Sequence, residues 1–171
     1  AGMGLSELYI NDKKIGNAEL SPALSDYTTR IYYVTYDVTH SIKTGDNAIG
    51  VILGNGRFFA PRTNYPTLMV NYGYPKLMLH MRVEYTDGSS QIVDSDKTWK
   101  LTTAGPIRAN NEYDGEEYDA RRELTGWAEP GFDDSHWQPA RVVSAPGGKL
   151  VAQMMDPIRI TGTIKPISMH E

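Results

Sequence analysis

The 171-residue chain carries a net charge of −4 and an isoelectric point near 5.6, and its lysines and arginines are scattered, which argues against a nucleic-acid partner. It has no cysteine, which excludes disulfides, thiolate metal sites and a cysteine nucleophile. No apolar run has the length of a membrane span, so we expect no membrane partner. The cellular location stays open, because a signal could have been cleaved or could belong to a longer parent chain.

The composition favours one all-β domain. A chain of this length can bury a substantial core within a single domain. Its 11 tyrosines, 16 glycines and 10 prolines accompany many short segments separated by Gly, Pro, Asp and Asn, and few long helical patterns, which is typical of all-β folds. We therefore predict a single domain over residues 1–171.

Three strands are predicted in the first third of the chain. The segment Gly4–Ile10 reads as a strand almost from the first residue, so we expect the chain to be a piece of something longer. Arg30–Val38 has large side chains on both faces, and Thr39 after it can cap a single helical turn. Ala48–Leu53 is apolar almost throughout, which indicates a central strand. It stops at Gly54-Asn55-Gly56, a loop that can adopt positive φ.

The middle of the chain contains a predicted hairpin. Leu77–Tyr85 alternates apolar and polar residues with a period of two. Asp87-Gly88 supplies the turn, and Gln91–Asp94 returns along it. A short strand follows at residues 99–101, and Val151–Ile164 near the end of the chain shows the same alternation.

The acidic stretch of residues 112–121 gathers hydrogen-bonding groups beside aromatic rings. Five of its ten residues are Asp or Glu, two are Tyr, and Arg closes it. Carboxylates accept hydrogen bonds or coordinate hard cations, and Arg donates in a rigid fork, while Tyr offers an apolar ring with a polar tip. These groups suit the hydroxyls and C–H faces of a sugar. The alternative is a solvated hairpin whose tyrosine rings pack inward while the acids face water.

The sequence contains no complete catalytic or metal-binding motif. The four histidines lack ligand spacing. An EF-hand loop starting at Asn110 fits at its third, fifth and sixth positions but has Arg121 where the twelfth needs Glu, which leaves a calcium site built from several loops open. There is no nucleophile elbow. Glu116 and Glu117 point to opposite faces of a strand, whereas glycoside hydrolysis needs two acids across the sugar.

The segment Arg57–Arg62 sets two arginines around aromatic residues at the end of the central strand, and it can complement the acidic stretch. The two segments form either surface ion pairs, each worth little, or a rim that grips a polar ligand with Arg57 and Arg121 as donors. In the second case the candidate carbohydrate-binding residues are Asn55, Arg57, Phe58, Tyr113, Asp114, Glu116, Glu117, Asp119 and Arg121, with Tyr113 or Phe58 facing the sugar ring.

Several stretches, in this order, resemble a known family. They are Leu8–Asn11, Leu20–Pro22, Tyr36–Thr39, Asn47–Val51 through Gly54–Gly56, Tyr113–Glu116 with Tyr118–Arg121, Phe132–Ser135 with Trp137, and Ala145–Leu150 before Ile167-Ser168. Together they resemble the N-terminal β-sandwich domain of bacterial α-L-rhamnosidases, glycoside hydrolase family 78. The resemblance covers nearly the whole chain, and the run Tyr-Asp-Gly-Glu followed by Tyr-Asp-Ala-Arg is its most specific part.

The resemblance implies an antiparallel jelly-roll β-sandwich of the galactose-binding type. It implies that this chain alone is non-catalytic, because catalysis in that family belongs to a separate (α/α)6 barrel. The expected partners are a rhamnose-containing carbohydrate and the other domains of a longer chain, including that barrel. No cofactor is required, although sandwiches of this type sometimes bind sugars with calcium. A bacterial periplasmic or extracellular location is favoured over the cytoplasm.

One departure from the family separates the hypotheses. Where the family commonly has Gly-Trp-Tyr after the Gly-x-Gly turn, this chain has Arg57-Phe58-Phe59 and so loses its best stacking platform. The first hypothesis is an accessory domain of an α-L-rhamnosidase with a carbohydrate-binding site. The second is a purely structural domain that packs on the catalytic barrel and positions it. The third is a free-standing hydrolase that uses two of the acids.

Overall fold

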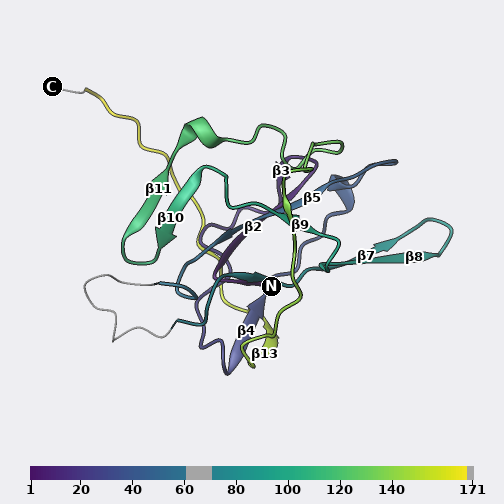
Figure 1. Ribbon diagram of the computed structural model, residues 1–171, viewed down its shortest axis with the longest axis horizontal. Helices are drawn as coiled ribbons and strands as arrows, with labels where there is room; N and C mark the ends of the chain where they lie inside the picture. Colours follow the sequence, from purple (N-terminus) through teal and green to yellow (C-terminus); the bar gives the residue numbers. More distant parts are fainter. Residues whose placement is uncertain (61–70, 169–171) are drawn as a thin grey trace.

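The computed structural model describes residues 1–60 and 71–168, and within these ranges the regular structure is almost entirely β (Figure 1). Two 3-10 helices of three residues each, η1 (Thr39–Ser41) and η3 (Ala120–Arg122), are the described helical elements. No described helix is long and apolar enough to cross a membrane. The predicted all-β class with antiparallel sheets is therefore confirmed, with one parallel pair as the exception.

A three-stranded antiparallel sheet lies at the centre of the fold. Strand β2 (Leu5–Ile10) pairs with β3 (Lys13–Lys14) on one side and with β5 (Ile49–Gly54) on the other. The β2–β5 register runs from Leu5 opposite Gly54 to Ile10 opposite Ile49, so both predicted strands are confirmed. The central position is held by β2, however, and the apolar strand β5, predicted to be central, lies at the edge of this sheet. The same register places the loop that follows Gly54 beside the start of β2.

The parallel pair joins β4 (Arg30–Tyr33) to β13 (Lys149–Ala152). Because β13 offers four residues, the ladder ends at Tyr33, and the prediction that this strand continues to Val38 is wrong. The predicted cap at Thr39 is also wrong. Val38 is the N-cap residue of η1, and the Asp37 carboxylate accepts the Thr39 N–H bond at 2.9 Å.

The segment predicted as the first strand of a hairpin, Leu77–Tyr85, contributes to two separate strands with different partners. β6 (Lys76–Leu77) pairs with β1 (Gly2–Met3), whereas β7 (His80–Glu84) pairs with β8 (Ser90–Asp94). The predicted Asp87-Gly88 turn is confirmed, with Gly88 at φ 85°, a conformation that glycine adopts without strain. The β7–β8 hairpin projects from the body of the molecule (Figure 1).

Two further antiparallel pairs complete the described strands. β9 (Lys100–Leu101) pairs with β12 (Gln138–Pro139), and β10 (Ile107–Asn111) pairs with β11 (Gly115–Tyr118). The acidic stretch thus forms the turn and the second strand of a hairpin. Tyr113 and Tyr118 are 43% and 52% exposed, so the expectation that their rings pack inward is wrong.

The main apolar cluster combines aromatic side chains from the loops with aliphatic side chains from the strands. Phe58 is fully buried, and its ring meets Tyr27 edge-on at 4.8 Å between centroids and stacks on Tyr72 at 5.4 Å. Met3 and Ile31 close the cluster. Aromatic pairs in these geometries add about 0.5–1.5 kcal/mol each beyond their buried area, so this cluster locks the loop after β5 onto β1 and β4.

The segment that follows β13 is extended but leaves the sheet. Its one described bridge joins Ile158 to Glu19, so the alternation in Val151–Ile164 does not correspond to a strand beyond Ala152. No described strand pairs with the later residues, and the apolar side chains Ile160 and Ile164 are 74% and 97% exposed. The end of this segment points away from the body in Figure 1.

Candidate functional site

The turn of the β10–β11 hairpin is organised by Asn111. Its side-chain oxygen accepts the backbone N–H bonds of Tyr113 and Asp114 at 2.8 and 2.9 Å, and its amide nitrogen donates to the Asp114 carboxylate at 2.9 Å. Gly115 then turns the chain at φ 81°. An Asn side chain that folds back on its own backbone is a typical turn device, so Asp114 is committed to the turn.

The loop after β5 docks directly on this hairpin. The Asn55 backbone N–H donates to the Asn110 side-chain oxygen at 2.7 Å, and the Asn55 side-chain nitrogen donates to the Asn110 carbonyl at 2.8 Å. Gly56 follows at φ 49°, as the glycine-rich loop predicted. Asn55 therefore joins two segments that lie 55 positions apart in the sequence. Its side-chain amide, predicted to bind sugar hydroxyls, donates to Asn110 instead.

Arg57 brings the two predicted halves of the rim together. Its Nε lies 3.7 Å from a carboxylate oxygen of Glu112, and its guanidinium lies 5.8 Å from the centroid of the Tyr113 ring. The Arg57 side chain is 27% exposed and Glu112 is 41% exposed, a setting in which an ion pair contributes little to stability. We call Asn55, Arg57, Glu112 and Tyr113 the hairpin rim. Arg62, the other arginine of the predicted pair, lies outside the described residues.

Phe58 does not belong to the rim. Its ring is 0% exposed and packs among Tyr27, Tyr72 and the Lys76 ammonium, which lies 4.9 Å from the ring centroid. The prediction that Phe58 could face a sugar ring is therefore wrong, because a buried ring has no face to offer a ligand. The aromatic ring that does lie at the rim is Tyr113, at 43% exposure.

The other acids of the stretch lie further along β11 and in η3. Glu116 and Glu117 sit opposite Asn110 and Ala109 and are exposed, and successive strand residues point to opposite faces. Asp119 begins η3 and receives two hydrogen bonds from the Arg121 guanidinium, at 2.7 and 2.9 Å. These hydrogen bonds hold the pKa of the Asp119 carboxyl below its usual value. Asp119 and Arg121 thus form a local pair, and no described contact joins them to Arg57.

Carboxylates of the hairpin are engaged in separate local contacts. Calcium takes six to eight oxygen ligands, typically with several carboxylates. In this structure Asp114 is held by Asn111, Glu112 by Arg57 and Asp119 by Arg121. Within residues 1–60 and 71–168, no group of three or more His, Asp or Glu side chains could hold a metal.

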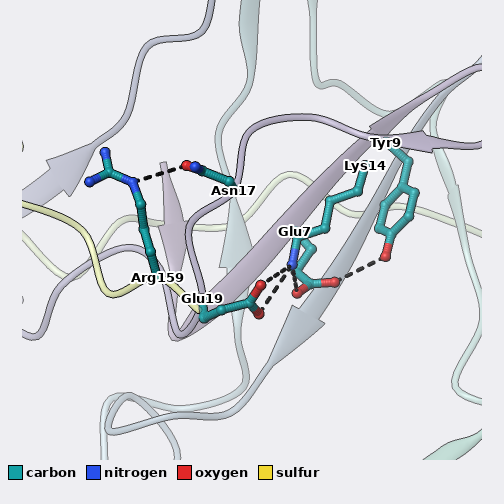
Figure 2. Close-up of polar contacts among 6 residues, drawn as sticks. All are labelled: Glu7, Tyr9, Lys14, Asn17, Glu19 and Arg159. Carbon is teal, nitrogen blue, oxygen red and sulfur yellow. Dashed lines mark hydrogen bonds and ion pairs between the residues drawn. The ribbon is translucent and has the colours of Figure 1, made fainter. Parts of the chain in front are cut away.

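A polar network that the sequence did not reveal lies beside β2 and β3. Lys14 Nζ is 2.6 Å from Glu7 and 3.2 Å from Glu19, and the Tyr9 hydroxyl donates to Glu7 at 3.0 Å (Figure 2). Burial by itself lowers the pKa of Lys14, but the hydrogen bonds and charges of the two glutamates outweigh burial and raise that pKa. Both carboxylates, Glu7 and Glu19, thus contact the same Lys14 ammonium, and the network as a whole keeps one net negative charge.

Next to this network, a cleft of about 270 Å³ opens between three segments that are distant in sequence. Residues 16–18, 34–36 and 153–159 supply its walls, with Tyr36 and Arg159 among the lining side chains. The Arg159 Nε donates to Asn17 at 3.0 Å across 142 positions. No sequence motif pointed to this cleft, because its residues are single positions in unrelated segments.

Comparisons with known proteins agree on one family. The model of the α-L-rhamnosidase N-terminal domain family matches residues 1–162. An α-L-rhamnosidase of Formosa agariphila is 37% identical over 163 residues, covering 92% of this chain and 17% of that protein.

Solved structures give the same result. The α-L-rhamnosidase from Dictyoglumus thermophilum matches with a TM-score of 0.87 and 49% identity, over 99% of this chain and 18% of that one. The Streptomyces avermitilis α-L-rhamnosidase complexed with L-rhamnose matches with a TM-score of 0.86 and 34% identity, over 94% of this chain and 16% of that one. These likenesses support the predicted jelly-roll sandwich.

The chain spans less than a fifth of the length of each of these relatives. Its match to the family model nevertheless covers almost every residue, including the acidic stretch and the loop that docks on it. The chain therefore belongs to the α-L-rhamnosidase N-terminal domain family.

Proposed function

We propose that this chain is a non-catalytic domain of an α-L-rhamnosidase, and that it packs on the remainder of that enzyme and positions its catalytic (α/α)6 barrel. The observation that carries the proposal is the exposed apolar side of the segment after β13. Met154, Ile158 and Ile160 are 88%, 60% and 74% exposed. Apolar side chains gathered in this way mark interaction surfaces.

The alternation along this segment gives it two distinct sides. Odd-numbered residues from Gln153 to Arg159 line the cleft described above, whereas the intervening even-numbered residues do not. Among the residues that do not line the cleft, Met154, Ile158 and Ile160 are exposed apolar side chains, and the exposed Asp156 lies between the first two. We call these three side chains the outer apolar face. The relatives are more than five times as long as the part this chain matches, which supports other domains of the same enzyme as the occupant of this face.

Association with the separately produced remainder of the parent chain tests the packing. We expect saturable binding by calorimetry, and Ile160→Asp should weaken it at least tenfold, because a buried unpaired carboxylate is costly. The matched control is Ile92→Asp, which changes an exposed isoleucine of β8 and should leave binding unchanged. No association, or equal loss in both variants, would contradict the proposed packing.

The non-catalytic part of the proposal has a separate assay. Two acids of the hairpin are held in local pairs, Asp119 on Arg121 and Glu112 near Arg57. The exposed Glu116 and Glu117 point to opposite faces of β11, whereas hydrolysis needs one acid and one base across the scissile bond. We expect no turnover of an aryl α-L-rhamnoside by the purified chain. Turnover that disappears in Glu116→Gln or Glu117→Gln would favour the free-standing hydrolase instead.

A second candidate function, carbohydrate binding at the hairpin rim, is favoured by Tyr113. Its ring is half exposed beside the Arg57 guanidinium and the Glu112 carboxylate, and a relative has been solved with L-rhamnose. An aromatic face flanked by donors and acceptors suits a sugar ring.

Titration of L-rhamnose into the chain, with and without calcium, tests this second candidate. Tyr113→Ala should abolish the heat of binding, whereas Tyr118→Ala, an exposed tyrosine on the same hairpin, should not. The absence of heat in both conditions would exclude rhamnose as a ligand of the rim.

A further inference from the structure

The cleft beside Arg159 combines one arginine with an aromatic and apolar wall. Its volume of about 270 Å³ lies just below the range of small-molecule sites, roughly 300–1,000 Å³. Tyr36, Met155 and Pro157 supply the apolar part of the lining, and Asn17, Thr35 and Arg159 supply polar groups. A site of this make-up can hold a ring with one apolar face and a polar substituent.

Arg159 is held in place but keeps most of its hydrogen-bonding capacity. Its Nε donates to the Asn17 side-chain oxygen at 3.0 Å, and its two terminal nitrogens point away from Asn17 (Figure 2). Within the described ranges it forms no ion pair with a carboxylate. A guanidinium has five N–H donors, so this anchored fork can receive a bidentate acceptor.

The backbone around Arg159 is fixed by a second, independent contact. The Glu19 N–H donates to the Ile158 carbonyl at 2.9 Å, and the Glu19 side chain is held by Lys14. The carboxylate of Glu19 is therefore engaged by Lys14 and forms no ion pair with Arg159 in the described structure. Upstream, Gln153 accepts the Ala23 N–H bond at 2.9 Å, so both ends of this wall are attached to the domain.

The remaining polar groups of the cleft are hydroxyls and side-chain amides, which can donate as well as accept. Burial raises the pKa of the Tyr36 phenol, which also shares a hydrogen bond with the Ser21 side chain. The Asn17 oxygen is engaged by Arg159, which leaves its amide nitrogen to donate. Donors gathered around one cation favour a ligand rich in acceptors and negatively charged.

We propose that the cleft between Asn17, Tyr36 and Arg159 binds a sugar residue that carries a carboxylate, with the Arg159 fork on the carboxylate and the Tyr36 ring beside the C–H face of the sugar. This site is separate from the hairpin rim and from the outer apolar face. It implies that the domain contacts acidic glycans in addition to any neutral sugar.

The test is a titration of D-glucuronate into the 171-residue chain, followed by amide NMR spectra. D-glucose is the uncharged control, and acetate is the control that has a carboxylate but no ring. We expect saturable shifts for Asn17, Tyr36 and the Arg159 side-chain N–H with D-glucuronate, and at least tenfold weaker binding of each control.

Arg159→Gln should weaken D-glucuronate binding about tenfold or more, because it removes the charge and the fork. Arg108→Gln is the matched control, since Arg108 is exposed and bonds only backbone carbonyls in the described structure. Both variants are first checked for an unchanged spectrum elsewhere, and Asn17→Ala serves as the second cleft variant. The proposal is overturned if D-glucuronate causes no shifts in the cleft, if glucose or acetate binds equally well, or if Arg159→Gln and Arg108→Gln behave alike.

Discussion

Replacing Phe58 with alanine tests whether this ring is a core element rather than part of a ligand site. The ring is fully buried and contacts Tyr27 and Tyr72 at centroid distances of 4.8 and 5.4 Å. Truncation of a buried Phe costs about 3–5 kcal/mol from lost transfer energy and the cavity left behind. For a chain of this size, each kcal/mol lowers the melting temperature by roughly 2–4 °C, so we expect a fall of roughly 6–20 °C.

Urea unfolding followed by tryptophan fluorescence gives the free energy directly. Phe58→Leu keeps most of the apolar volume but loses both ring contacts, so it should cost about 1–2 kcal/mol. Phe59→Ala is the neighbouring control, because Phe59 is only partly buried and its ring partner, Tyr74, is 76% exposed. A loss below about 1 kcal/mol for Phe58→Ala, or one no larger than that of Phe59→Ala, would refute the assignment of Phe58 to the core.

Three further predictions concern the contacts that shape the loops. Asn110→Ala removes the acceptor of the Asn55 N–H bond and should cost about 1–2 kcal/mol in urea unfolding. A Cβ at Gly148 would lie 2.5 Å from a backbone oxygen, so Gly148→Ala should cost about 1–3 kcal/mol, whereas Gly105→Ala, in open space, should be nearly neutral. The lowered pKa of Asp119 means that its contribution to stability is present above its unfolded-state pKa near 3.8 and is lost as the pH falls through its folded-state pKa. Amide spectra should therefore show η3 loosening on acidification, and Asp119→Asn should abolish that pH response.

The strands with strong local patterns could be predicted, and those set by distant partners could not. Leu5–Ile10, with Leu8 and Ile10 on one face, and the apolar run Ile49–Gly54 were both predicted as strands and are strands, although their pairing was not predicted. The strand that starts at Arg30 ends at Tyr33, where its pairing with the short partner β13 ends. The residues near Arg30 do not indicate the length of that partner strand. In the same way, the alternation of Val151–Ile164 reflects two environments, a cleft and an exposed side, rather than a strand in a sheet.

The same distinction between local patterns and distant partners applies to the candidate site. The contact of Arg57 with the acidic hairpin was predicted from complementary charge and is present with Glu112. The burial of Phe58 was missed, because an aromatic residue beside two arginines reads equally well as a ligand platform or as a core residue. The cleft at Arg159 was missed because it depends on a contact with Asn17 across 142 positions. Such a site is formed by long-range packing, and long-range packing cannot be recognised in a single sequence.

Amide hydrogen exchange of residues 153–164, compared between the isolated chain and the whole parent enzyme, tests the proposed role most directly. If the outer apolar face is covered by other domains, exchange at Ile158 and Ile160 should slow at least tenfold in the parent, because docking excludes water from an exposed segment. Amides of the β7–β8 turn serve as the internal reference. Equal exchange rates for residues 153–164 in both proteins would contradict a domain that packs through this face.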